Sequence, residues 1–184
     1  MDNSQRKQIA IFANGCFWCT EAVFSMLKGV ESVAPGYIGG TIKNPNYEQV
    51  SSGNTGHAEA IKIEYDPSVI SFYDLLTVFF NTHDPTTLNR QGNDIGTQYR
   101  SAIFYVNENQ KQDAENLIKE LNKSKAYDKP VITEVSPATE FFSAEKYHLD
   151  YYKNHQNAPY CQLVIAPKLE KVQKRFRELL KSDS

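Results

Sequence analysis

The reactive side chains of this sequence gather in one short segment, Gly15-Cys16-Phe17-Trp18-Cys19. The segment holds two of the three cysteines and the only tryptophan of the chain. It follows an apolar run typical of a buried strand and precedes residues with helical spacing, so we predict that Cys16 lies at a helix N-terminus. The helix dipole and unpaired backbone N–H groups there stabilise a thiolate, the nucleophilic form of cysteine. The pattern predicts a nucleophilic Cys16 beside an apolar wall of Phe17 and Trp18; the alternative is a small buried core residue.

The other two cysteines are candidates for a second thiol. Cys19 has the spacing of a redox-active Cys-x-x-Cys dithiol, or is an inert core residue one turn into the helix. Cys161 ends a polar segment that could bend toward the site, or is itself a core cysteine. An odd number of cysteines disfavours a framework of structural disulfides and suits a reducing compartment in which thiols do chemistry.

A carboxyl side chain, Glu59, is the second candidate for chemistry. Residues 57–66 alternate between apolar and charged side chains, and Glu59 is in phase with the apolar face of this predicted strand. Burial there raises the pKa of a carboxyl above its usual value of about 4.3, so that Glu59 serves as a protonated general acid. The alternative is a strand that begins only at Ala60 and leaves Glu59 in solvent.

Residues 83–100 form a long polar segment without periodicity, and such a segment inside a compact domain usually has a function. It contains Asp94, between Gly92 and Gly96, and Tyr99 near its end. Taken singly, these residues are typical of a turn aspartate and a core tyrosine.

Zinc is the main competing interpretation of Cys16 and Cys19. A structural zinc site usually takes four ligands in two close pairs, whereas the four histidines and Cys161 are scattered and no second Cys-x-x-Cys follows. His57 and His148 are interpreted as hydrogen-bonded structural residues. We therefore predict thiol chemistry without a metal or other cofactor.

Periodicity predicts one domain, residues 1–184, in which strands and helices interleave. Strands are predicted over residues 7–13, 30–40, 57–66, 101–106 and 131–135, with a strand-like or irregular segment at 160–166. Helices are predicted over residues 20–27, 68–82, 108–123, 143–155 and 167–181. This succession favours a mixed sheet layered with helices.

Charge and hydropathy exclude several classes of partner. The formal net charge is −2, with 20 Lys and Arg against 22 Asp and Glu, and no basic stripe would neutralise nucleic-acid phosphates. No apolar run approaches the roughly 18 residues that a membrane helix needs, and the first residues lack the pattern of a signal peptide. We expect a monomeric cytoplasmic protein that acts on small molecules or proteins.

Several segments match, in order, the motifs of a known family. They are Gly15-Cys16-Phe17-Trp18-Cys19-Thr20-Glu21, Gly36-Tyr37-Ile38-Gly39-Gly40, Tyr47, Gly56-His57-Ala58-Glu59, His83-Asp84-Pro85 and Gly92-Asn93-Asp94-Ile95-Gly96-Thr97-Gln98-Tyr99-Arg100-Ser101. The chain resembles peptide methionine sulfoxide reductases of the A type over residues 9–161. The resemblance implies an α/β (α+β) fold, a two-layer sandwich with a mixed sheet and a ferredoxin-like core. It also implies reduction of the S epimer of methionine sulfoxide, free or in oxidised proteins.

The resemblance also implies roles for single residues. Cys16 would be the nucleophile, Glu59 the proton donor, and Phe17 and Trp18 the wall around the substrate methyl group. Tyr47 and Tyr99 would hydrogen-bond the sulfoxide oxygen, and Asp94 would position the substrate.

The resemblance further implies how the enzyme is regenerated. Cys161 would resolve the sulfenic acid left on Cys16, with Cys19 as the alternative, and thioredoxin would reduce the resulting disulfide. Leu149 departs from the glutamine common in the family. Two rival functions are a thioredoxin-like Cys16–Cys19 dithiol that exchanges disulfides and a zinc-supported interaction domain.

Overall fold

The computed structural model describes residues 7–182 as one mixed sheet with helices packed on it. The strands are β1 (Gln8–Asn14), β2 (Val30–Ile38), β3 (Ala58–Tyr65), β4 (Arg90–Gln91), β5 (Asp94–Ile95), β6 (Ser101–Tyr105), β7 (Glu134–Pro137) and β8 (Phe142–Ser143). The α-helices are α1 (Phe17–Ser25), α2 (Tyr47–Ser51), α3 (Phe72–Asn81), α4 (Glu108–Lys123), α5 (Tyr151–Asn154) and α6 (Ala166–Arg175). Short helical turns are η1 (Thr97–Tyr99), η2 (Lys146–His148), the π-helical η3 (Cys161–Ile165) and η4 (Arg177–Leu179).

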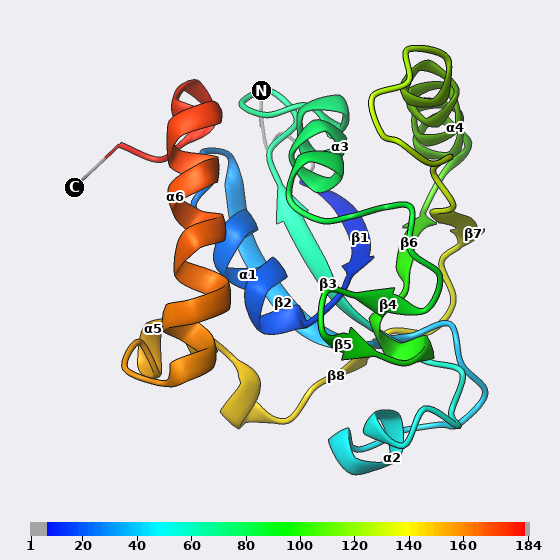
Figure 1. Ribbon diagram of the computed structural model, residues 1–184, viewed down its shortest axis with the longest axis vertical. Helices are drawn as coiled ribbons and strands as arrows, with labels where there is room; N and C mark the ends of the chain where they lie inside the picture. The colour runs from blue at the N-terminus through cyan, green and yellow to red at the C-terminus, as the bar shows by residue number, and fades with distance from the viewer. Residues whose placement is uncertain (1–6, 183–184) are drawn as a thin grey trace, which may run out of the picture.

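The main sheet has six strands in the order β7-β6-β1-β3-β2-β8, and β4 and β5 form a separate two-stranded ribbon (Figure 1). β1 pairs antiparallel with β3 and β6, whereas β7 runs parallel to β6, so the sheet is mixed. Its four inner strands are β6, β1, β3 and β2; α1 connects β1 to β2, and α3 lies between β3 and β6 in the chain.

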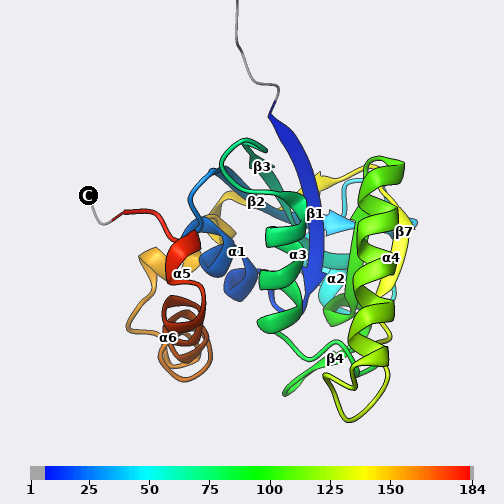
Figure 2. The same cartoon turned by 90° about the horizontal axis from the view of Figure 1, so that it is seen from above.

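Side-chain alternation along the strands explains the two-layer arrangement. On β1, Ala10 and Phe12 face the core beneath the helices, while Ile11 and Ala13 face the other side of the sheet. Phe12 contacts the rings of Phe24 on α1 and of Phe72 and Phe79 on α3. Viewed from above, α3 lies between α1 and α4 (Figure 2). The predicted two-layer α/β fold is confirmed.

Helix caps agree with the local sequence. Ser71 and Asp74 form a capping box at the start of α3, and Asn46 and Gln49 form another at the start of α2. Both boxes satisfy backbone N–H groups that a helix leaves unpaired at its N-terminus. The second box fixes the direction in which Tyr47, the first residue of α2, leaves the loop.

Several predicted elements differ from the structure. The segment 160–166 is helical rather than strand-like: its β-branched residues resemble a strand, but Cys161 and Ile165 are buried four residues apart and Leu163 is exposed. The helix predicted over 143–155 is broken into η2 and α5, because Asp150 between them has a left-handed backbone with φ of 51°. Strand β7 begins at Glu134, three residues later than predicted.

Among residues 7–182, no helix is long and apolar enough to cross a membrane.

Candidate active site

Cys16 lies in the turn that joins β1 to α1, as its flanking residues predict. Gly15 has φ of 101°, and a Cβ atom on it would lie 2.8 Å from the Gln91 side chain, so both conformation and space favour glycine. Cys16 is the N-cap residue of α1, and its carbonyl accepts the backbone N–H groups of Cys19 and Thr20. The reactive thiol is therefore held where the chain changes from strand to helix.

The thiols of Cys16 and Cys19, three residues apart, affect each other's pKa. Burial, followed by the hydrogen bond with Cys19, raises the pKa of Cys16, although the backbone N–H of Trp18 lowers it. The hydrogen bond from Cys16 lowers the pKa of Cys19 to about 7. The predicted stabilisation of a Cys16 thiolate by the helix N-terminus is thus outweighed by burial, and the two sulfurs titrate as a pair. Cys16 must lose its proton as it reacts.

Glu59 lies on β3, on the same side of the sheet as Ile61 and Ile63, and only 1% of it is exposed. Its Oε2 accepts the backbone N–H of Phe17 at 3.1 Å, which holds the carboxyl beside the first turn of α1. Burial raises the pKa of Glu59 to about 8, despite the opposing effect of that hydrogen bond. The predicted burial is confirmed, and at neutral pH the group carries a proton that it can donate.

Two phenols lie within the electrostatic influence of Glu59. Tyr47 stands at the start of α2, and burial, then the Glu59 charge, raises its pKa to about 12. Tyr99 lies on η1, and the same causes raise its pKa above the ordinary value. Both hydroxyls therefore remain protonated as hydrogen-bond donors over the physiological range. The long loop, 83–100, thus delivers Tyr99 to the neighbourhood of Glu59.

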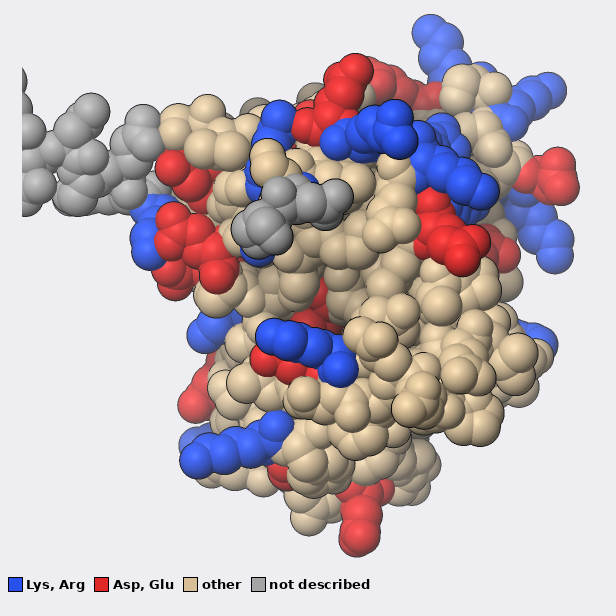
Figure 3. Space-filling model, turned by 90° about the vertical axis from the view of Figure 1, so that its left-hand side faces the viewer, with Lys and Arg blue, Asp and Glu red and all other residues tan. Residues whose placement is uncertain are grey.

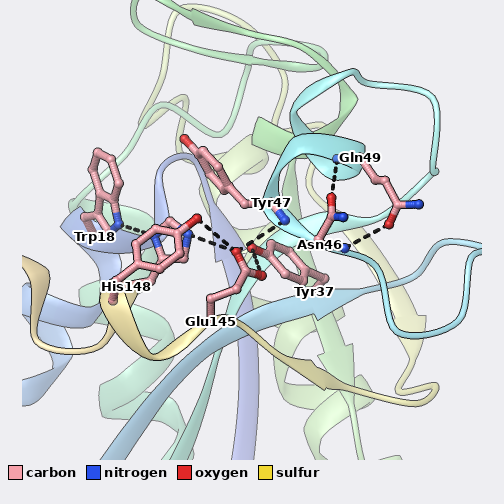
Figure 4. Close-up of polar contacts among 8 residues, drawn as sticks. Trp18, Tyr37, Asn46, Tyr47, Gln49, Glu145 and His148 are labelled. Atoms are coloured by element: carbon pink, nitrogen blue, oxygen red, sulfur yellow. Dashed lines mark hydrogen bonds and ion pairs between the residues drawn. The ribbon is translucent and has the colours of Figure 1, made fainter.

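Aromatic rings enclose this cluster on one side. Phe17 is fully buried and packs against Tyr37 and His148, with ring centroids 5.7 and 5.0 Å apart. Trp18 is half-buried and stacks on Tyr151 of α5 at 3.7 Å, with the ring planes 7° apart. The indole Nε1 also donates to His148 Nδ1 at 2.9 Å (Figure 4). The Trp18 ring is therefore fixed from two directions.

Glu145 joins several parts of the site and was not singled out from the sequence. Its carboxylate accepts the hydroxyls of Tyr37 and Tyr147 and the backbone N–H of Tyr47, at 3.2, 3.0 and 3.3 Å. His148 Nε2 lies 3.5 Å from the same group, and Figure 4 shows Tyr37 and His148 beside it. A Glu two residues before a Tyr-His pair was the only local signal, because its partners are distant in sequence.

Tyr160 is a second residue that the sequence did not single out for a role. Its hydroxyl donates to Asp94 Oδ2 on β5 at 2.9 Å and lies 3.7 Å from Cys19 Sγ. Its ring meets that of Trp18 edge-on, with centroids 6.0 Å apart. Asp94 is thereby connected to α1, as its predicted membership of the site requires.

Cys161 is fully buried on η3, which packs against α1. Burial, followed by the charge of Cys19, raises the pKa of the Cys161 thiol. All three cysteines are free thiols.

His57 has two backbone hydrogen-bond partners, as its interpretation as a structural residue predicts. His57 Nδ1 accepts the backbone N–H of Gly40 at 3.0 Å, and its Nε2 donates to the carbonyl of Ile42 at 2.7 Å. Within residues 7–182, no group of three or more His, Cys, Asp or Glu side chains is arranged to hold a metal ion.

A paired thiol, a protonated buried carboxyl, phenol donors and an aromatic wall define a thiol-based oxidoreductase on a two-layer α/β fold. The sequence model of the family described as peptide methionine sulfoxide reductase matches residues 8–180. A curated relative from Chromobacterium violaceum, named peptide methionine sulfoxide reductase MsrA, is 53% identical over 94% of this chain and 98% of its own length. The chain belongs to the peptide methionine sulfoxide reductase family, as the A-type enzyme that reduces the S epimer of methionine sulfoxide.

Solved structures share the architecture. The reduced form of Mxr1 from Saccharomyces cerevisiae superposes with a TM-score of 0.78 and 29% identity, over 86% of this chain and 91% of that one. Mxr1 in complex with Trx2 superposes with a TM-score of 0.55 and 20% identity, over 81% and 87% of the two chains, a likeness of fold.

Proposed function

We propose that Cys16 is the nucleophile and Glu59 the proton donor of methionine sulfoxide reduction in this chain. The observation that carries this assignment is the buried, neutral Glu59 carboxyl hydrogen-bonded to the backbone of Phe17, the residue next to Cys16. The oxygen of a sulfoxide is a poor leaving group until it is protonated. An acid held at the first turn of the nucleophile's helix supplies that proton where the S–O bond breaks.

The reaction proceeds by attack of Cys16 sulfur on the sulfoxide sulfur. The S–O oxygen takes the Glu59 proton and is transferred to Cys16, and the proton that Cys16 loses passes to the Glu59 carboxylate, which is thereby reprotonated. Methionine is released and Cys16 becomes a sulfenic acid. Two electrons pass from the thiol sulfur to the substrate sulfur. Tyr47 and Tyr99 donate hydrogen bonds to the oxygen, which carries more negative charge in the transition state than in the substrate.

Phe17 and Trp18 hold the substrate methyl group, and Asp94 positions the rest of the substrate. Inversion at sulfur exchanges the positions of the methyl group and the oxygen. The methyl group of the other epimer would then face the polar donors, and its oxygen would face the aromatic wall. The fixed orientation of the Trp18 ring, between His148 and Tyr151, supports a strong preference for one epimer.

Resolution of the sulfenic acid runs through two thiols and ends at Cys161. Cys19, one turn after Cys16 at the start of α1, condenses with the sulfenic acid first, with loss of water. The Cys161 thiol then attacks Cys19, which releases Cys16 and leaves a Cys19–Cys161 disulfide for thioredoxin to reduce. Support for the reductant comes from the Mxr1 structure that was solved with Trx2.

The same proposal places the enzyme in the cytoplasm as a monomer whose one domain spans the chain and needs no cofactor. Three free thiols suit a reducing compartment. Its substrates are methionine sulfoxide residues of oxidised proteins and small methionine sulfoxides.

A single-turnover experiment tests the assignment. Reduced protein is mixed with the separate S and R epimers of N-acetylmethionine sulfoxide, and methionine product and free thiols are counted together. We expect product from the S epimer only, loss of two thiols, and a disulfide at Cys161 by peptide mapping. A Cys16→Ser variant that still forms product would overturn the role of Cys16, and a full-yield Cys16–Cys161 disulfide in Cys19→Ser would remove Cys19 from the relay.

A further inference from the structure

Tyr160 connects a thiol of the active site to a carboxylate that is not in contact with that thiol. Its hydroxyl has one proton, which it donates to Asp94 Oδ2 at 2.9 Å. The phenol oxygen is therefore left as an acceptor for the S–H group of Cys19, whose sulfur lies 3.7 Å away. The three groups form a directed chain of hydrogen bonds, from Cys19 through Tyr160 to Asp94.

This chain of hydrogen bonds leads from a buried thiol to a carboxylate nearer the surface. Cys19 is only 4% exposed and packs in the main core, whereas Asp94 lies on the exposed ribbon of β4 and β5 and is itself partly exposed. The Tyr160 ring is held edge-on against Trp18, which keeps the hydroxyl in place between the thiol and the carboxylate. A buried thiol that must become a thiolate needs such a route.

We propose that Tyr160 and Asp94 form a proton path that deprotonates Cys19 as it attacks the sulfenic acid on Cys16, an inference that rests on the function proposed above. The Cys19 proton passes to the Tyr160 oxygen while the phenolic proton passes to the Asp94 carboxylate. Cys19 sulfur then forms the S–S bond with Cys16, and the sulfenic hydroxyl leaves as water with a proton from the reprotonated Glu59. Tyr160 is neutral before and after the step.

The charged and titratable groups around Cys19 are consistent with this direction of transfer. Its pKa is lowered first by the hydrogen bond from Cys16 and then by the Lys168 charge on α6. It is also lowered by the hydrogen bond that Tyr160 donates to the thiolate, which the transfer creates by placing the Cys19 proton on the phenol oxygen. Burial and the Asp94 charge act in the opposite sense. Protonation of Asp94 by the path removes that opposing charge at the moment when the thiolate forms.

The test isolates the first disulfide in a Cys161→Ala background, where only Cys16 and Cys19 remain. Quenched-flow mixing with N-acetylmethionine S-sulfoxide yields two rates, formation of methionine and loss of free thiols. Tyr160→Phe should leave methionine formation within about twofold and slow disulfide closure by roughly tenfold or more at about pH 6, because positioned proton transfer is worth that much or more. Sulfenic acid should accumulate and be trapped by dimedone. Tyr73→Phe, which removes a hydroxyl from an exposed position on α3, is the matched control.

The pH dependence of disulfide closure separates a proton path from a purely structural role for Tyr160. The defect in Tyr160→Phe should shrink toward about pH 9, where hydroxide and buffer bases deprotonate the thiol without the path. Asp94→Asn keeps a hydrogen-bond acceptor but cannot take up the proton, so it should show the same defect in closure. Closure within twofold of the parent at every pH, or an equal slowing of methionine formation and closure in Tyr160→Phe, would overturn the proton path.

Failure of the proton path is distinguishable from failure of the proposed function. If the parent protein forms no methionine, or Cys19→Ser still loses two thiols at the parent rate, the proposed function is at fault. If the parent forms methionine and the Cys16–Cys19 disulfide while Tyr160→Phe does both at parent rates, only the proton path is wrong.

Discussion

At the scale of single residues, the site combines a carboxylic acid that is protonated at neutral pH, Glu59, with two thiols, Cys16 and Cys19, whose titrations are linked. Glu59 is neutral because the sheet and α1 exclude water from it, and the backbone of Phe17 holds it in place. Cys16 is less acidic than its position at a helix N-terminus would suggest, because burial outweighs the helix dipole. The chemistry therefore depends on the environments of Cys16 and Glu59 more than on their residue types.

Replacement of the acid tests its role directly. Glu59→Gln keeps the size of the side chain and removes the proton, so methionine formation in a single turnover should slow by roughly 10²-fold or more. Glu64→Gln on the same strand, where the side chain faces solvent, should react at the parent rate. Circular dichroism checks that both variants are folded, and a parent rate in Glu59→Gln would contradict the assignment.

The raised pKa of Glu59 also predicts a pH dependence of stability. The folded protein binds this proton more tightly than the unfolded chain, since the folded pKa is about 8 against an ordinary value of 4.5. The stabilisation is complete below the unfolded pKa and is lost as pH rises through 8, by an amount on the order of 5 kcal/mol. Urea unfolding between those pH values should therefore show falling stability in the parent protein.

The comparison with Glu59→Gln isolates this effect. The amide does not titrate, so its stability should fall less over the same pH range. Some fall should remain, because burial also raises the pKa of Glu21, to about 7. Equal pH dependence in Glu59→Gln and the parent would show that Glu59 is ionised in the folded protein.

At the scale of elements, α5 has a structural role that its short length conceals. The helix Tyr151–Asn154 carries the ring that stacks on Trp18, yet four residues cannot form a stable helix alone. Glu21 of α1 is only 3% exposed, and burial raises its pKa while the backbone of Asp150 and Tyr151 lowers it, so its carboxyl lies at the start of α5. The position of the Tyr151 ring therefore depends on the contact between α1 and α5.

Removal of the Glu21 side chain should loosen the aromatic wall. Glu21→Ala empties a buried site where α1 meets the start of α5 and should lower the free energy of unfolding by about 1–3 kcal/mol. Trp18 is the only tryptophan, so its fluorescence reports on the stacking with Tyr151 directly. Glu21 and the exposed Glu170 of α6 line one cavity of about 420 Å³, so Glu170→Ala is the control. An unchanged emission spectrum in Glu21→Ala would contradict the link between Glu21 and the wall.

At the scale of the whole molecule, the second helical layer brings the end of the chain against its beginning. η3 and α6 pack on α1, which places Tyr160 and Cys161 beside a dithiol that lies more than a hundred positions earlier in sequence. The face shown in Figure 3, with α5 and α6, carries Lys and Arg interspersed with Asp and Glu rather than one continuous basic stripe. A neutral, mixed surface of this kind is suited to a protein partner more than to nucleic acid.

The position of Cys161 predicts how turnover fails without it. Cys161→Ala should form about one methionine per enzyme in a single turnover, since the chemistry at Cys16 precedes the relay. Steady-state turnover with thioredoxin and its reductase should be lost, whereas a small thiol such as dithiothreitol should restore part of it. Full turnover with thioredoxin would mean that the Cys16–Cys19 disulfide is itself the substrate of the reductant.

Local sequence determined the parts of this protein that depend on neighbours along the chain. The apolar run, Gly15 and the helical spacing after Cys16 located the thiol at a strand-to-helix turn, and the two-residue period of β3 located Glu59 on its buried face. Periodicity reports which face of an element is covered, so these predictions are confirmed. Periodicity cannot indicate that one particular residue has a positive φ. The break at Asp150 in the helix predicted over residues 143–155 was missed for that reason.

Only the tertiary structure decided which distant groups meet. The hydrogen bonds of Glu145, the position of Glu21 at the start of α5, and the chain from Cys19 through Tyr160 to Asp94 all join segments far apart in sequence. Tertiary structure also sets the pKa values of Glu59 and Cys16, because burial is the largest cause of the raised pKa of each group. A side chain's partners and its access to water are properties of the packed chain, because both are set by contacts that no local pattern encodes.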